Sequence, residues 1–561
     1  MQRCSLKMKI FLFVLAGAVY LFGLSVTVME IDAAQYAAMS REMLVNNHYL
    51  AVTARGIDFL DKPPLLFWLA ALSFKLFGVS TVAYKLPSLL MVMLGFYATY
   101  RLGKLLYDKN TGLLSAVLLC CCQAFIFFTN DVRTDANLAA AVIIAVWQIM
   151  ELLTTNKVRY FFGGCLGVAL AMLAKGPIGL MVPVCAIGAY VVAKRDFKIF
   201  LKWYWYAGLI LVVLLLSPML WGLYHQFGRR GIVFYFWTQS FGRLTGQNQW
   251  RDSTGYFFFV HTFLWAFLPW MFAAYYGAGM QLVRSVKSRF APFLAREALL
   301  LGGTVLPFIA LSFSHYKLPH YSFVIFPLVA ILTARFFIDC IDNPAMKKTY
   351  TVFYWIQSTL CIGSWIFALA CITVFFPCKN ILIWLALPCI AFFAYYYSHK
   401  KHNPFIRLLV PSIASILGVN LMLNVHFFPR LLSFQGGSRA AEYVRARHIP
   451  VNRFFTYPFS SSSTDFYTGS IVGTLDSASL KETLKQGTAW IYCELAGRRV
   501  MERLGYEPAV VDSFPNMHVS MITLKFLYFK TRPSSMGWQY IVRVEPLLTL
   551  AGDVRPAREG R

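Results

Sequence analysis

Charged residues are scarce in this chain of 561 residues. Asp, Glu, Lys and Arg together make up 14% of it, whereas they make up about 25% of an ordinary soluble protein. Apolar runs of roughly 18 residues or more, long enough to cross the hydrocarbon core of a bilayer, recur from residue 10 to about residue 428. The composition excludes an ordinary soluble globular protein and predicts a polytopic α-helical membrane protein.

Acidic residues are also few, and zinc-type cysteine spacings and glycine-rich phosphate loops are missing. There are 25 acidic residues against 52 Lys and Arg, a formal charge of +27. In a membrane protein Lys and Arg collect in cytoplasmic loops, so this excess does not indicate a nucleic-acid partner. Most of the 12 cysteines lie inside apolar runs, as small buried hydrophobes do. We therefore expect no metal, no other cofactor and no nucleic-acid ligand.

The apolar runs predict about thirteen membrane spans. Their centres fall near residues 19, 92, 121, 143, 166, 185, 213, 267, 305, 329, 363, 389 and 416. Loops rich in Lys and Arg alternate with short loops poor in positive charge. The positive-inside rule then places the N-terminus in the cytoplasm and, after an odd number of spans, the C-terminal region outside.

Two long loops are predicted on the outer side. The first covers residues 30–80 and contains DAAQYAAMSREML, which predicts an amphipathic helix, and PPLLFWLAALSFKLFG, which is too short and broken for a secure span. The second covers residues 224–255 and carries four arginines among many aromatics. Since these arginines break the positive-inside pattern, they indicate another role.

The composition changes at about residue 430. Residues 1–429 are predicted to form the transmembrane domain and residues 430–526 a small soluble α/β domain. In the latter, SRAAEYVRARH and AGRRVMERLG predict helices, and RFFTY, AWIYCEL and HVSMITLKFL predict strands. Residues 527–561 show no clear periodicity and are predicted to form a loosely held tail.

Two charged residues stand out in the first outer loop. Asp32 lies just past the first apolar run, at the start of the predicted helix, so it is either a helix N-cap or a functional carboxylate. Lys62 precedes Pro63 and Pro64, which restrict its backbone. Its ammonium either binds an anionic phosphate or snorkels from an interfacial helix.

Further charged motifs are predicted on the same outer face. NDVRTDANLAA carries Asp131, Arg133 and Asp135, for which a local ion pair worth about 0–1 kcal/mol is the plainer interpretation. The other two motifs are AKGPIGL, with Lys175, and SHYKLPHYSF, with His315, Lys317, His320 and Tyr321. A single charged residue at a helix end carries little information, but several such motifs at outer ends predict an active site at the bilayer surface.

Together these motifs resemble those of the bacterial aminoarabinose transferase and protein O-mannosyltransferase group. That group consists of glycosyltransferases of the GT-C fold, which use polyprenyl-phosphate sugars as donors. The resemblance covers the whole chain in outline, and its most specific parts are the two first-loop motifs, followed by KLPHY. It implies a sugar transferase of a bacterial plasma (inner) membrane whose site and C-terminal domain face the periplasm. Lipid A, a surface glycan or a protein would be the acceptor.

The resemblance also implies roles for individual residues. Asp32 matches the catalytic carboxylate and Asp135 a second acidic residue near the donor pocket. Lys62 matches the lysine that holds the lipid phosphate, and Arg243 matches a phosphate-binding arginine. The residues implied to line the cavity are Tyr36, Asp61, Lys317 and Tyr321.

The chain departs from the group's pattern at several positions. Ala33 follows Asp32 where group members often have Glu. Some aminoarabinose transferases hold a metal with a Glu and a His, and here those positions are Asp61 and Ser240, so a metal is not expected. A transporter or lipid flippase remains the alternative, although transporters place ionisable groups near the midplane of paired halves and this chain shows no half-repeat.

Overall fold

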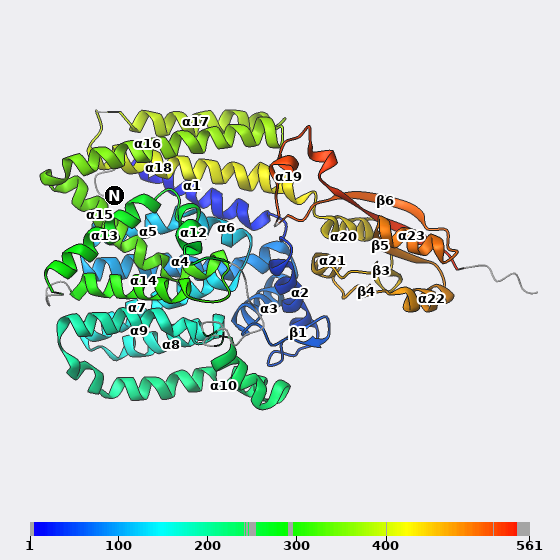
Figure 1. The fold of residues 1–561 in the computed structure, drawn as a ribbon, viewed down its shortest axis with the longest axis horizontal. Coiled ribbons are helices and arrows are strands. Elements are labelled where there is room, and N and C mark those ends of the chain that lie inside the picture. The colour runs from blue at the N-terminus through cyan, green and yellow to red at the C-terminus, as the bar shows by residue number, and fades with distance from the viewer. Residues whose placement is uncertain are drawn as a thin grey trace, which may run out of the picture. The chain divides into compact units, whose positions relative to one another are not determined.

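The computed structural model describes residues 5–239, 242, 245, 254–289, 295–399, 401–519 and 521–546. The chain forms two compact units (Figure 1). Unit 1 comprises Met1–Val28 and Met39–Pro429, and unit 2 comprises Met29–Ala38 and Arg430–Arg561. Each unit is considered separately below.

Nine helical segments in the described part of the chain are long and apolar enough to cross a membrane. They are α1 (Leu6–Ser25), α4 (Thr81–Leu106), α7 (Thr134–Thr155), α8 (Val158–Lys175), α10 (Trp203–Val233) with η2 (Phe234–Thr238), α14 (Ala295–Ser312), η4 (Pro319–Ile325) with α15 (Phe326–Asp342), η5 (Pro344–Met346) with α16 (Lys347–Ala370) and η6 (Cys371–Phe375), and α18 (Pro404–Met422) with η7 (Leu423–Phe427) and α19 (Phe428–Leu432).

The remaining predicted centres coincide with shorter or bent helices. The helices α5 (Lys109–Cys120) and α6 (Gln123–Asn130) form one bent pair at 50°, near centre 121. The 17-residue helices α9 (Ile178–Lys194) and α17 (Ile381–Tyr397) coincide with centres 185 and 389. Centre 267 falls in the break between α12 (Phe258–Ala266) and α13 (Met271–Lys287). Length and composition give nine spans in the described residues, or ten with the bent pair, so the number thirteen stays a prediction.

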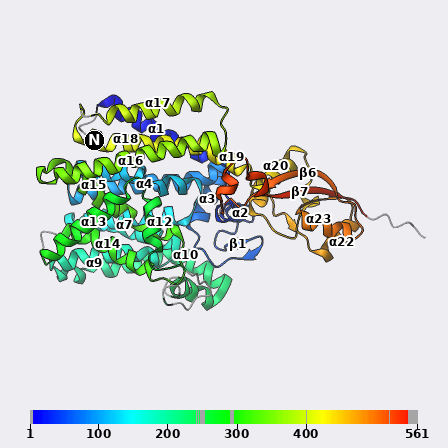
Figure 2. The ribbon, with the colours of Figure 1, turned by 45° about the horizontal axis from the view of Figure 1, so that its top comes forward.

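Small residues bring the helices that carry the candidate site close together. A Cβ atom on Gly167 of α8 would lie 2.7 Å from the backbone nitrogen of Ala145 on α7. A Cβ atom on Gly179 of α9 would lie 2.6 Å from the carbonyl of Ala171 on α8. Backbones can approach this closely only where no side chain intervenes, and this packing fixes the position of the C-terminal end of α8. Figure 2 shows α7, α9, α10, α12 and α14 within the same bundle.

The first predicted outer loop contains regular structure. It forms α2 (Asp32–Val45), the two-stranded hairpin β1 (Thr53–Ala54) and β2 (Ile57–Asp58), and α3 (Leu65–Phe77). The predicted helix in DAAQYAAMSREML is confirmed. The predicted second loop, residues 224–255, is wrong over its first part, because the apolar sequence IVFYFW continues the helical segment of α10 and η2 to Thr238 with a break at Gly228.

Unit 2 contains a five-stranded sheet in the order β4-β3-β5-β7-β6. The strand β3 pairs in parallel with β4 and β5, and β7 pairs antiparallel with β5 and β6. The strands are β3 (Phe454–Tyr457), β4 (Gly473–Thr474), β5 (Ala489–Glu494), β6 (Ala509–Asn516) and β7 (Gly537–Val544). The helices of unit 2 are α20 (Gly436–Ala446), α21 (Ser462–Thr468), α22 (Ser477–Lys485), α23 (Leu495–Arg503) and α24 (Leu524–Leu527). Its short 3₁₀ turns are η8 (Val451–Arg453) and η9 (Arg532–Ser534). Unit 1 also contains one such turn, η1 (Phe197–Leu201).

The predicted small α/β domain is confirmed, with two corrections. The strand predicted in HVSMITLKFL is wrong, because its described C-terminal part forms the short helix α24 and only Phe526 of that helix is buried. The loosely held tail predicted for residues 527–561 is wrong over Gly537–Val544, which form β7 between β5 and β6. The side chains of Ile541, Val542 and Val544 are fully buried, so β7 is part of the core of unit 2.

Candidate active site

The loop before Lys62 is held on one side by α2. The hairpin turns at Arg55 and Gly56, which both have positive φ (56° and 77°). The carboxylate of Glu42 accepts hydrogen bonds from Thr53 Oγ1 at 2.5 Å and from the backbone N–H groups of Arg55 and Gly56 at 2.9 Å. Since Glu42 is buried and a buried carboxylate needs such donors, the hairpin is fixed to the C-terminal half of α2.

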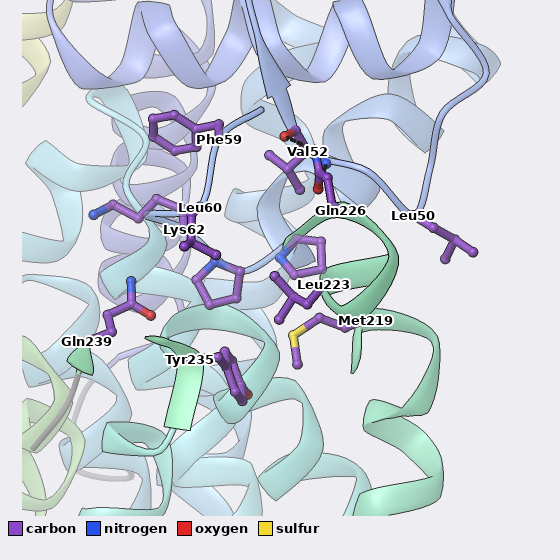
Figure 3. A pocket seen from close by; sticks show the side chains of 12 residues that line it. Leu50, Val52, Phe59, Leu60, Lys62, Met219, Leu223, Gln226, Tyr235 and Gln239 are labelled. Carbon is purple, nitrogen blue, oxygen red and sulfur yellow. Dashed lines mark hydrogen bonds between the residues drawn. The ribbon is translucent and has the colours of Figure 1, made fainter. Parts of the chain in front are cut away.

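The other side of this loop is held by α10 and η2. The Gln226 amide donates to the carbonyl of Val52 at 2.9 Å and accepts from its N–H at 3.2 Å. The Gln239 amide donates to the carbonyl of Asp61. Figure 3 shows Gln226 beside Val52 and Gln239 below Lys62, around a small pocket lined also by Met219, Leu223 and Tyr235. The position of Lys62 is therefore set by main-chain contacts on both sides of the loop.

The Lys62 side chain is mostly shielded from solvent. Its Nζ atom lies 2.6 Å from the Asp61 carboxylate, and 16% of the side chain is exposed. A lysine that only snorkelled would extend its ammonium into water. Here the ammonium is held against a carboxylate in a partly buried place, which favours a binding role.

A second cluster of charged side chains comes from three helical elements. Asp135 lies in the first turn of α7, Lys175 ends α8, and His320 and Tyr321 lie in η4. Lys175 Nζ donates to Asp135 Oδ1, and His320 Nε2 lies 3.6 Å from Asp135 Oδ2. Lys175 Nζ also lies 3.8 Å from the centre of the Tyr321 ring, a cation–π contact. All four side chains are buried, and we call them the Asp135 cluster.

The Asp135 cluster and the Lys62 loop belong to one site in unit 1. Lys62 is close enough to interact electrostatically with both Asp135 and His320. Nearby, Arg133 Nε binds Asp131 Oδ2 at 3.0 Å, so the local ion pair expected from the sequence is present. Buried charges are costly unless they are paired, and each of these three cations has a carboxylate partner.

A large apolar cavity opens beside this site. It has a volume of about 1030 Å³ and is lined by residues of α8, α9 and α10, with Lys175, Gln239 and Tyr321 among its polar members. It follows α8 from Tyr160 to Lys175, and fifteen residues of α-helix span about 22 Å. The cavity is therefore long and apolar, and the lysine Lys175 lies at one end of it.

The structure brings four of the predicted site residues together, namely Asp61, Lys62, Asp135 and Tyr321. Lys317 instead donates to the carbonyl of Thr254 at 3.0 Å and lies 5.8 Å from the Tyr256 ring. Asp32 and Tyr36 belong to unit 2. Arg243 and Ser240 lie outside the described residues. The role of each residue stays a prediction.

Sequence reasoning missed Glu42, Gln226 and Gln239, which position the Lys62 loop. Their partners are mostly main-chain groups, and such contacts leave no pattern in the sequence. Within the described part of the chain, no three His, Cys, Asp or Glu side chains gather as a metal site would require. The expected independence from a metal stays a prediction.

Comparison with known proteins finds a partial match to one protein family and a shared fold. Residues 61–221 match the family described as dolichyl-phosphate-mannose-protein mannosyltransferase. Among curated relatives are the undecaprenyl phosphate-alpha-4-amino-4-deoxy-L-arabinose arabinosyl transferases of Shewanella sediminis (24% identical, 56% of this chain and 56% of the relative) and Sodalis glossinidius (27% identical, 60% of each). An uncharacterized protein of Aquifex aeolicus is 24% identical over 57% of this chain and 61% of its own. The chain thus spans a little over half the length of these relatives.

Two solved structures share the fold over almost the whole chain. The structure of ArnT from Cupriavidus metallidurans bound to undecaprenyl phosphate has a TM-score of 0.74, with 15% identity over 98% of this chain and 100% of that one. Its apo state has a TM-score of 0.71, with 16% identity over 95% and 97%. The chain is therefore a membrane protein of the GT-C fold, and its resemblance to the aminoarabinose transferase and protein O-mannosyltransferase group is confirmed.

Proposed function

We propose that this protein is an integral-membrane glycosyltransferase that moves a sugar from polyprenyl (undecaprenyl) phosphate to an acceptor outside the cytoplasm. The acceptor would be lipid A, a surface glycan or a protein. The observation that carries the proposal is the apolar cavity of about 1030 Å³ that ends at Lys175, close to Lys62, in a chain of the GT-C fold.

The donor fits this cavity by its chemistry. A polyprenyl chain is a long hydrocarbon, and an apolar cavity of about 1030 Å³ can hold part of it. Its phosphate would lie at the cationic end, where Lys62 is now paired with Asp61 and Lys175 with Asp135. Each ammonium has three N–H donors, so it can bind a phosphate oxygen while it keeps its carboxylate partner. Arg243 is proposed as a third cation on the phosphate.

The transfer step uses these groups in a defined way. An acceptor oxygen forms a bond to the anomeric carbon, the bond from that carbon to the phosphate oxygen breaks, and the electron pair leaves with the phosphate. Lys62 and Lys175 stabilise the charge that grows on the phosphate. We propose that Asp32 takes the proton of a hydroxyl acceptor; an acceptor that is itself a phosphate requires little base, and Asp32 then orients it.

Asp135 has a different role in this proposal from the catalytic one expected from the sequence. Both of its carboxylate oxygens face other side chains, because Lys175 binds Oδ1 while His320 and Thr134 lie near Oδ2. A carboxylate engaged on both oxygens is poorly placed to accept a proton from an acceptor. We assign Asp135 to holding Lys175 and His320 in place.

The proposed location is the plasma (inner) membrane of a bacterium, with the site and unit 2 on the periplasmic side. The alternation of charged and uncharged loops supports this orientation.

The test is sugar transfer by the purified protein in lipid vesicles. Labelled undecaprenyl-phosphate aminoarabinose and undecaprenyl-phosphate mannose are supplied with lipid A, surface glycan and envelope protein, and labelled product is measured. We expect product with one donor, its loss in Lys62→Ala, and normal product in the matched control Lys75→Ala, which removes an exposed lysine of α3. Movement of the donor across the vesicle without product would identify a flippase instead.

A further inference from the structure

The segment just before α2 is fastened into unit 2 through Glu30. Its backbone N–H donates to the side-chain oxygen of Gln435 at 2.9 Å. Its carboxylate oxygen Oε1 accepts from Ser461 Oγ at 2.9 Å and also from Ser463 Oγ. Residues more than 400 positions later in the chain therefore hold both the main chain and the side chain of Glu30.

The contact between Glu30 and the two serines depends on a glycine, Gly437. A Cβ atom on Gly437, in the first turn of α20, would collide with both serine hydroxyls and lie 3.0 Å from Glu30 Oε1. The N-terminal end of an α-helix carries partial positive charge that stabilises an anion, and α20 has eleven residues. The contact is thus built from hydroxyl donors, a helix end and a glycine that keeps the space open.

Glu30 is directly linked to the first turn of α2. The carbonyls on either side of it accept hydrogen bonds from that turn: Met29 from the N–H of Ala34 at 3.0 Å, and Ile31 from the N–H of Gln35 at 3.1 Å. Asp32 is the first residue of this helix. The contacts that fix Glu30 therefore also fix the direction of the first turn of α2.

We infer that Glu30 is a positioning residue for Asp32, and that one task of the C-terminal domain is to hold the start of α2 through Gln435, Ser461 and Ser463. This inference rests on the proposed function, in which Asp32 acts on the acceptor. Removing a partner that orients an active-site group lowers activity by about 10–100-fold, and a misplacement of about 1 Å costs a similar factor.

The test compares turnover with donor binding in matched variants. Glu30→Ala should lower kcat about 10–100-fold while the Kd for undecaprenyl phosphate stays within a factor of two or so of wild type, since Lys62 and Lys175 belong to unit 1. Ser463→Ala removes one donor, and Glu30→Gln retains an acceptor oxygen, so both should lie between Glu30→Ala and wild type. The control is Glu442→Ala, which removes a glutamate of α20 whose side chain is 71% exposed and should leave kcat unchanged.

A double variant separates positioning from general damage. With the carboxylate of Asp32 already lost, Glu30 has nothing to position, so Glu30→Ala/Asp32→Asn should turn over no more slowly than Asp32→Asn alone. A further 10–100-fold loss in the double variant, or wild-type kcat in Glu30→Ala, would overturn the inference. In either case an inactive Asp32→Asn would leave the proposed function standing, whereas a fully active Asp32→Asn would overturn the role of Asp32 itself.

Discussion

Lys175 and Asp135 offer a test in which stability and donor binding should separate. Both side chains are buried, and Lys175 donates directly to the Asp135 carboxylate. Removing one member of a buried ion pair leaves an uncompensated charge, which costs about 3–5 kcal/mol in the free energy of unfolding. We therefore expect Lys175→Met and Asp135→Asn each to unfold at a clearly lower temperature than wild type.

The double variant Lys175→Met/Asp135→Asn should recover most of that stability, because no unpaired charge remains and neutral replacement of a buried pair is often tolerated. It should not recover binding of undecaprenyl phosphate. One hydrogen bond between a charged group and phosphate contributes about 1.5–3 kcal/mol, so Kd should rise about 10–150-fold at 1.4 kcal/mol per factor of ten.

The assay measures thermal unfolding in detergent beside titration with undecaprenyl phosphate for the four proteins. The variant Lys104→Met changes a lysine in the last turn of α4, distant in sequence from the site, and serves as the control. Wild-type affinity in the double variant would refute the phosphate role of Lys175. A double variant less stable than either single variant would refute the reasoning about the buried pair.

Three further predictions concern the mechanism and the topology. Asp32→Asn should lower turnover about 10²–10⁴-fold with donor binding intact, whereas Lys62→Ala should weaken both; wild-type turnover of Asp32→Asn would make Asp32 a helix cap only. Transfer should survive a chelator, because two lysines can neutralise the phosphate; loss restored by zinc or magnesium would contradict this. Cysteines placed at exposed Ile57 and Lys481 should be labelled from the periplasm, and protection of either would overturn the predicted number of spans.

The membrane helices were largely predictable because length and apolarity alone decide them. Centre 267 shows the limit of that signal. The apolar run there is continuous in sequence, yet the structure breaks it at Phe267–Trp270 between α12 and α13. Residues 224–255 were likewise predicted to form a loop, although the aromatic residues before Thr238 continue the helix. Hydrophobicity shows that a segment is buried but does not locate its bends.

The errors in unit 2 have a different cause. β7 lies between β5 and β6, and its pairing with β5 joins Ala489 to Val544, far apart in the chain. The sequence of β7 follows a turn-rich stretch and contains the polar residues Gln539 and Arg543. The local pattern of residues therefore did not distinguish this strand from a loosely held tail. HVSMITLKFL contains β-branched and aromatic residues typical of strands, but tertiary packing overrides that preference.

The charged motifs of the site were predictable one by one, but their arrangement was not. Asp135, Lys175 and His320 come from separate helical elements, and only the packing of α7, α8 and η4 brings them within contact. The sequence could therefore predict only that they share one face of the membrane. It could not show that Lys175 takes one oxygen of Asp135 while His320 approaches the other, which is the observation that changes the role of Asp135.

Glu30 and Glu42 show how one short stretch of chain serves two tasks. Glu30 binds side chains of unit 2 just before Asp32, whereas Glu42, further along α2, binds the hairpin of unit 1 that leads to Lys62. In the proposed mechanism, proton transfer by Asp32 and phosphate binding by Lys62 would thus depend on different contacts. Because these contacts are separate, a substitution of Glu30 should lower turnover, whereas a substitution in the Lys62 loop should weaken donor binding.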